Sequence, residues 1–220
     1  MSKTTLIPGA LAAALLLAAA PAFAANTLID FEGATSFASI TDYYNGGSDS
    51  AGAMGPSDFG VSFTGAAQAL ANDELGPYFS NAPTPGTVMF ATDSSAVMNV
   101  AQGFTGELSF FYSAASSALD VVTIYSGLNG TGNVLGLVSL SANAQMGGCS
   151  DSAFCNWQRI ALSFAGTGQS VSFGGNAGGV AFDNVAINTV TAAVPEPQTT
   201  AMLAFGLAGL MVAVRRQRRS

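Results

Sequence analysis

Two cysteines have the spacing that most directly suggests chemistry. Cys149 and Cys155 lie six positions apart in a chain of 220 residues. A metal site needs more ligands than two thiolates, and the sequence has no histidine to add one. A catalytic thiol would also lack a base partner. In an exported protein, a disulfide that closes this small loop is the default expectation.

A loop rich in acids and glycine is the second candidate. It carries three aspartates: Asp42, Asp49 and Asp58. Their spacing does not fit an EF-hand, which places ligands at alternate positions and closes with a glutamate. A calcium loop of another kind and an ordinary solvated loop both stay open.

Three aromatic side chains suggest contact with sugars. Tyr43 and Tyr44 lie in the acidic loop, and Trp157, the only tryptophan, follows Cys155 closely. Exposed rings at these positions could stack on a sugar, and Tyr43 and Tyr44 are the candidate glycan-binding residues. The alternative is that the tyrosines fold onto the domain and that Trp157 packs in the core or anchors a loop.

Catalytic patterns are missing from the sequence. Without histidine there is no Ser-His-Asp triad, and the glycines form no phosphate-binding or dinucleotide-binding motif. Glycoside hydrolysis needs only two carboxylates about 5–10 Å apart, but no spacing selects such a pair. We therefore expect no enzymatic activity and no catalytic residues.

The charge of the central segment differs from that of the whole chain. Residues 25–194 hold twelve Asp and Glu against one basic residue, Arg159, which gives a net charge of −11, whereas the whole chain has −7. Such a domain repels nucleic acid and anionic lipid. Cations, neutral glycans or simple solubility fit this charge.

Short β-rich runs separated by turn residues must position these side chains. The pattern predicts strands at 27–31, 61–64, 87–90, 96–100, 106–113, 119–125, 134–141, 157–164, 170–173 and 180–188. Leu108, Phe110 and Tyr112 occupy every second position and so share one face of a strand, as in a half-buried antiparallel sheet. Asn129-Gly130 predicts a hairpin turn, because both residues tolerate positive φ. We expect an all-β fold over residues 25–191, an antiparallel β-sandwich of jelly-roll type.

Residues 1–24 have the three parts of a secretory signal peptide. Lys3 supplies the positive region, residues 11–20 are apolar, and Ala22-Phe23-Ala24 fits the small-residue cleavage pattern. We expect cleavage after Ala24 or one residue later.

Residues 192–220 form a linker and a tail with three parts. The motif Pro195, Glu196, Pro197 comes first, and the uncharged segment 199–214 follows. Sixteen residues in a helix span about 24 Å, close to the thickness of a bilayer core. A basic end closes the chain with Arg215, Arg216, Arg218 and Arg219. This cluster favours the cytoplasmic side, so a single apolar helix would hold the domain outside the membrane.

The order of these three parts at the end of the chain resembles a PEP-CTERM sorting signal. The resemblance implies a Gram-negative exported protein that is anchored transiently in the inner membrane and then cut by exosortase near Pro195–Pro197. Proteins of this kind accompany exopolysaccharide and biofilm production. The final location would be the outer surface or the extracellular matrix.

The body resembles carbohydrate-binding β-sandwiches and other domains found with this tail. Four short segments carry the likeness: residues 29–32, 44–47, 125–132 and 182–185. In such sandwiches a Phe-Glu pair near the first strand and an aspartate in the last often hold a structural calcium. The resemblance assigns that role to Glu32 and Asp183, with Asp30 as an additional ligand. The alternative is that the acids are solvated, or that Asp183 binds backbone at a strand bend.

Three functions are compatible with the sequence. The first is a non-enzymatic surface or matrix protein associated with exopolysaccharide. The second is a carbohydrate-binding module that recognises the exopolysaccharide, and the third is a glycan-active hydrolase. Exosortase is the expected processing partner, and calcium is the only expected cofactor.

Overall fold

The computed structural model of the protein describes residues 23–191, with side chains from 26 to 189. This part forms nine strands and two short 3-10 helices: β1 (Phe23–Ile29), β2 (Val61–Phe63), β3 (Ala67–Ala71), β4 (Thr87–Ala91), β5 (Val97–Ala114), β6 (Ala118–Tyr125), β7 (Val134–Leu140), η1 (Met146–Gly148), β8 (Gln158–Ser172), η2 (Gly174–Asn176) and β9 (Val180–Thr191). All pairings between these strands are antiparallel. The predicted all-β antiparallel class is confirmed.

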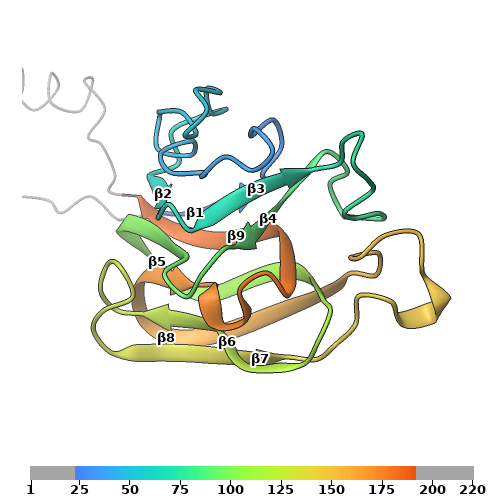
Figure 1. Cartoon of the computed structure of the whole chain (residues 1–220). Helices are drawn as coiled ribbons and strands as arrows, with labels where there is room; N and C mark the ends of the chain where they lie inside the picture. The colour runs from blue at the N-terminus through green and yellow to red at the C-terminus, as the bar shows by residue number, and fades with distance from the viewer. Residues whose placement is uncertain (1–22, 192–220) are drawn as a thin grey trace, which may run out of the picture. The chain divides into compact units, whose positions relative to one another are not determined.

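The strands form one continuous sheet that folds over on itself. Its hydrogen-bonded order is β3-β4-β9-β5-β8-β6-β7, while β1 pairs with β9 and β2 pairs with β5. Figure 1 shows β1, β3, β4 and β9 in one layer and β6, β7 and β8 in the other. The long strand β5 joins the layers, because it pairs with both β9 and β8.

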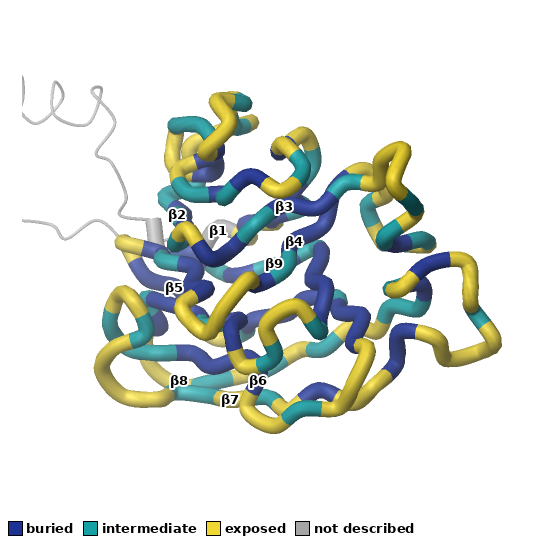
Figure 2. Tube along the Cα trace, in the orientation of Figure 1, coloured by how far each residue is buried: buried dark blue, intermediate teal, exposed yellow. Residues whose placement is uncertain are grey.

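The main core lies between the two layers. Phe110, Phe173 and Phe182 are buried there, and their ring centroids lie 5.0–6.2 Å apart. Figure 2 shows the buried residues concentrated along the strands and the exposed ones on the loops. The predicted inward face of β5 is confirmed, since Leu108 and Tyr112 are buried with Phe110.

A second, smaller apolar cluster comprises Leu70, Phe79, Val88 and Ala181. Val88 in β4 belongs to it, while the next residue, Met89, belongs to the main core, so the cluster lies on the other face of β4. Phe79 comes from the segment 72–86 that links β3 to β4. This packing holds that segment against the outside of the sheet.

The hairpin between β6 and β7 has the predicted turn. Tyr125 pairs with Val134 across its base. At its tip Asn129 and Gly130 have φ of 57° and 68°, the left-handed conformation that both residues tolerate. The predicted turn chemistry is confirmed.

Three strands differ from the prediction. β3 was not predicted, because its sequence of alanines, Gln68 and Leu70 lacks the β-branched residues typical of strands. β5 and β8 each run through two predicted strands, and register shifts near Gly103 and Gly106 let β5 continue past its glycines.

Other predictions fall outside the described residues. These are the linker, the apolar helix and the basic end within 192–220, and the signal peptide except for its last two residues, which lie in β1. The jelly-roll type and the exact domain boundaries stay predictions. Within residues 23–191, no helix is long and apolar enough to cross a membrane.

Candidate functional site

The pairing of the first and last strands brings the predicted acids to one region. β1 lies beside β9, with Ile29 opposite Val185. Asp30 and Glu32 follow β1 directly, and Asp183 lies in β9. A site that uses both Glu32 and Asp183 needs the first and last strands to be neighbours, and the topology meets that requirement.

Asp183 is fully buried and accepts several hydrogen bonds. The Thr84 N–H donates to Oδ2 at 2.8 Å, and the Asn184 N–H donates to Oδ1 at 2.7 Å. Asn184 has a φ of 50°, so the strand bends beside the carboxylate. Backbone bonding at a strand bend, one of the alternatives for Asp183, is therefore present.

Burial makes the ionised form of Asp183 costly. It raises the pKa of this carboxyl from 3.8 to about 6, against the lowering effect of the hydrogen bonds from Thr84 and Asn184. The charge of Glu32 raises this pKa further. Among residues 23–191 the only basic side chain is Arg159, which pairs with Glu107 at 3.4 Å. No basic side chain of this part therefore neutralises the buried carboxylate.

Oxygen atoms crowd around the hydroxyl of Thr84. Its Oγ1 lies 2.8 and 2.9 Å from the two carboxylate oxygens of Asp183, 3.3 Å from Oδ1 of Asn184 and 3.5 Å from the carbonyl oxygen of Asp30. One hydroxyl proton can serve only one or two of these acceptors. A surplus of oxygens around a buried carboxylate is the environment that a hard cation such as Ca²⁺ prefers.

Glu32 binds the far end of the segment 84–87, which begins at Thr84. Its Oε1 accepts hydrogen bonds from the N–H groups of Gly86 and Thr87, both at 2.9 Å. Residues 84–87 therefore connect Glu32 with Asp183. Sequence reasoning missed Thr84, although the prolines on both sides of it indicate a stiff, extended segment.

The three predicted ligands do not meet as three carboxylates. Within residues 23–191, the only group of three or more acids or cysteines whose ligand atoms all lie within 4.8 Å of one another is Cys149, Asp151 and Cys155. The oxygens nearest Asp183 come instead from Thr84, Asn184 and the Asp30 backbone. A cation here would be held by one carboxylate and several neutral oxygens, with Glu32 and the Asp30 side chain beside it.

The two loop tyrosines support the acids rather than facing solvent. Tyr43 and Tyr44 are 3% and 0% exposed. The Tyr43 hydroxyl donates to the Glu32 carbonyl at 2.9 Å, and the Tyr44 hydroxyl donates to Oδ1 of Asp30 at 3.2 Å. The prediction that these rings stack on sugar is therefore wrong, because they are covered by the domain. The alternative of tyrosines folded onto the domain is confirmed.

The acids of the neighbouring loop serve the loop itself. Asp49 is buried and accepts the N–H groups of Thr35, Ala51 and Ala53 at 2.8–2.9 Å. Burial raises its pKa, but these hydrogen bonds outweigh burial and hold the pKa below 3.8. Asp42 and Asp58 accept hydrogen bonds from their own turns. Each of the three aspartates therefore stabilises a different part of the loop through its own hydrogen bonds.

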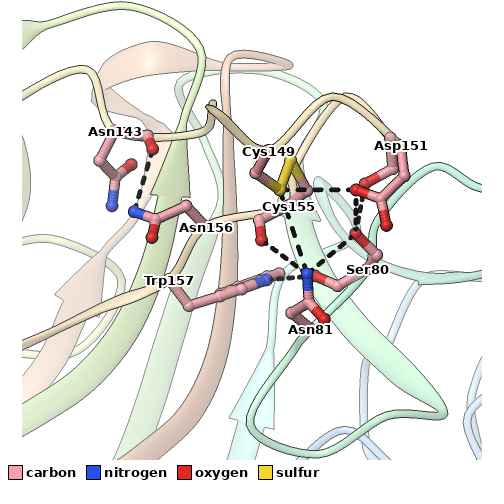
Figure 3. Close-up of a disulfide and its surroundings, with 9 residues drawn as sticks. Ser80, Asn81, Asn143, Cys149, Asp151, Cys155, Asn156 and Trp157 are labelled. Carbon is pink, nitrogen blue, oxygen red and sulfur yellow. Dashed lines mark hydrogen bonds between the residues drawn. A yellow bond between two sulfur atoms is a disulfide. The ribbon is translucent and has the colours of Figure 1, made fainter. Parts of the chain in front are cut away.

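The predicted disulfide between Cys149 and Cys155 is present (Figure 3). Because both sulfurs are bonded to each other, the nearby Asp151 does not complete a metal site with them. The disulfide loop also pairs with the segment 72–86, since the Ser80 N–H donates to the Phe154 carbonyl at 3.0 Å.

Trp157 strengthens the contact between the disulfide loop and the segment 72–86. Its Nε1–H donates to the Ser80 carbonyl at 2.9 Å (Figure 3). Its ring packs edge-to-face on Phe79, with the ring centroids 6.5 Å apart. The packing interpretation of Trp157 is confirmed. The disulfide loop thus fixes the segment whose far end carries Thr84.

Comparison with known proteins concerns the tail first. Residues 193–219 match the model of the PEP-CTERM protein-sorting motif. The chain carries this motif. A PEP-CTERM signal marks an exported protein that is anchored transiently in the membrane and processed by exosortase, as the resemblance of the tail implied. No curated protein sequence matches the chain.

The described domain has distant likenesses among solved structures. One is the K2 cleaved adhesin domain of Lys-gingipain, at 12% identity and a TM-score of 0.45, covering 74% of this chain and 99% of that one. Another is the CBM22-1 xylan-binding domain from Paenibacillus barcinonensis Xyn10C, at 12% identity and 0.40, covering 79% and 100%. A third is CsCBM6-3 from Clostridium stercorarium in complex with cellobiose, at 12% identity and 0.37, covering 59% and 87%.

Proposed function

We propose that this protein acts without catalysis at the cell surface or in the extracellular matrix of a Gram-negative bacterium, in association with exopolysaccharide. The observation that supports this role is the PEP-CTERM motif at residues 193–219. In this proposal the apolar segment 199–214 holds the exported chain in the inner membrane until exosortase cuts near Pro195–Pro197. The acidic domain then reaches its destination without the basic end.

The burial of Asp183 also supports a non-catalytic role, although its pKa resembles that of a catalytic acid. Burial, and to a smaller extent the charge of Glu32, raises the pKa of Asp183 to about 6, as is typical of a catalytic acid. However, Asp183 is 0% exposed, and its oxygens bind Thr84 and Asn184. A substrate has no access to this carboxyl, so Asp183 is better suited to holding a cation.

Calcium is the proposed structural partner of the domain. Asp183, the Thr84 hydroxyl, the Asn184 amide oxygen and the Asp30 carbonyl would hold it, and Glu32 would keep residues 86–87 in place. The ion would neutralise the buried carboxylate and join the two ends of the domain. Its role would be to stabilise the fold in a calcium-containing extracellular medium.

Processing tests the proposal directly. We would express the full chain in a host with exosortase and in the same host without it, and follow size and location by immunoblotting. The expected result is a shortened, released form only when exosortase is present, and its loss when Pro195, Glu196 and Pro197 are all replaced by Ala. A chain that is shortened and released equally without exosortase would contradict the proposal.

A further inference from the structure

A surface cavity beside the tip of the β6–β7 hairpin has no role in the cation site. It measures about 350 Å³, which is near the lower end for small-molecule sites and is enough for a sugar unit. The turn after β4, the end of β6, the hairpin tip and the end of β8 all contribute residues to its lining. The cavity is therefore built from segments that are distant in the chain.

The hairpin tip forms a fixed wall of this cavity. The Asn129 N–H donates to Oδ1 of Asn99 at 2.7 Å, and the Asn99 amide donates back to Oδ1 of Asn129 at 2.9 Å. The Gly130 N–H donates to the hydroxyl of buried Ser170 at 3.0 Å. These bonds pin the segment 125–132, which the sequence singled out, against β5 and β8.

The cavity combines an aromatic ring with polar groups that have no partner in the described part of the chain. Tyr125 is half-buried, and a Cβ on Gly130 would lie 3.9 Å from its Cε2. The hydroxyls of Tyr125, Ser94 and Ser172 make no hydrogen bond within residues 23–191, and the side-chain N–H₂ of Asn129 makes none either. Donors and acceptors beside a ring are the groups that a polyhydroxylated ligand needs.

The charges around the cavity select the kind of ligand. None of the residues that line it is charged, and the surrounding domain is strongly acidic. An anionic ligand would be repelled and would find no basic partner. A neutral sugar offers C–H groups to the negative face of an aromatic ring and hydroxyls that both donate and accept.

We propose that Tyr125, Asn129, Ser94 and Ser172 form a binding site for one unit of a neutral saccharide. This site would give the proposed matrix protein a defined class of ligand, and the inference rests on that proposed function. It also replaces Tyr43 and Tyr44 with a different aromatic residue. Its test is independent of sorting, because exosortase processing can succeed while saccharide binding fails.

Binding of the purified full chain to immobilised neutral gluco-, xylo-, manno- and galacto-oligosaccharides tests the site, with uronic-acid oligosaccharides as the charged comparison. We expect binding to at least one neutral series and none to the charged one. Tyr125→Ala should weaken binding about tenfold or more, while Tyr125→Phe should retain most of it. Leu128→Ala, on the same hairpin but outside the cavity lining, is the matched control and should change nothing.

A second variant tests the site with a substitution that should leave the fold intact. Asn129→Asp keeps the acceptor that Asn99 uses and tolerates the positive φ, but it removes the free amide donor and adds a negative charge. It should weaken binding at least about fivefold with an unchanged melting temperature. The proposal is overturned if no neutral saccharide binds, or if binding survives both Tyr125→Ala and Asn129→Asp.

Discussion

Replacing Asp183 with Asn separates the cost of the buried charge from its use in holding a cation. The amide keeps one oxygen for the hydrogen bonds of this site and loses the other, which accepts the Thr84 N–H. It also loses the negative charge that calcium would need. Without calcium the substitution removes the cost of the buried charge, whereas with calcium it also removes the charge that would hold the ion.

The magnitude can be worked from the pKa of Asp183. The unfolded chain ionises this carboxyl at 3.8 and the folded protein at about 6. Between these values the folded state binds more protons, so the stability of the calcium-free protein falls as pH rises from about 4 to 6. A difference of roughly two pKa units corresponds to about 3 kcal/mol at neutral pH. Asn removes this cost, while the unsatisfied Thr84 N–H costs about 1–3 kcal/mol.

Thermal unfolding at neutral pH, in chelator and in calcium, measures both effects. In chelator the variant should lie within about 2 kcal/mol of the wild type, because the two contributions nearly cancel. Calcium at a hundred times its dissociation constant should stabilise the wild type by about 2.7 kcal/mol and leave the variant unchanged. Glu74→Gln, at an exposed acid of the loop after β3, is the matched control and should respond like the wild type.

Two results would refute this reasoning. One is a wild-type protein whose melting temperature is the same in chelator and in calcium. The other is an equal calcium response in the wild type and in Asp183→Asn, which would place the cation elsewhere.

Three further predictions concern stability. Gly174→Ala should cost at least about 2 kcal/mol, because the new Cβ would lie 2.5 Å from backbone atoms of Ser94, whereas Gly65→Ala, with its nearest atom 3.9 Å away, should cost little; equal denaturant midpoints would contradict this. Replacing Cys149 and Cys155 together by Ser should cost about 2 kcal/mol, since the closed loop is short, and urea unfolding measures it; an unchanged midpoint would show that the disulfide is dispensable. Folding lowers the pKa of Asp49, so its contribution to stability is present above pH 3.8 and is lost as pH falls through the folded pKa. Between about pH 5 and 2 the melting temperature of Asp49→Asn should therefore fall less steeply than that of the wild type, and an equal fall in both would refute the assignment.

Much of the fold could be predicted because its signals are local. The alternation of Leu108, Phe110 and Tyr112 fixes which face of β5 is buried, since neighbouring side chains point to opposite sides of a strand. Asn129-Gly130 fixes the hairpin turn through its own backbone preferences. β3 was missed because its alanines gain their strand conformation from pairing with β4 rather than from their own propensity.

The candidate site was only partly predictable because its geometry is long-range. The acids Glu32 and Asp183 could be named, but Thr84, which lies 99 positions from Asp183, has no pattern that connects it to the carboxylate. Tyr43 and Tyr44 are likewise buried in contacts with residues outside their own turn, since their hydroxyls bond Glu32 and Asp30, which lie 11 and 14 positions away. Residue type alone did not distinguish these rings from Tyr125.

By itself the sequence determined the class of the fold, the disulfide and the sorting motif, together with a central segment of net charge −11. Each of these depends on residue type, composition or spacing over a short stretch. The tertiary structure decided which oxygens gather at Asp183, which tyrosines are covered and which ring borders a cavity. Those features depend on the pairing of β1 with β9 and on the folding of the sheet over its core, which bring together residues that are distant in the chain.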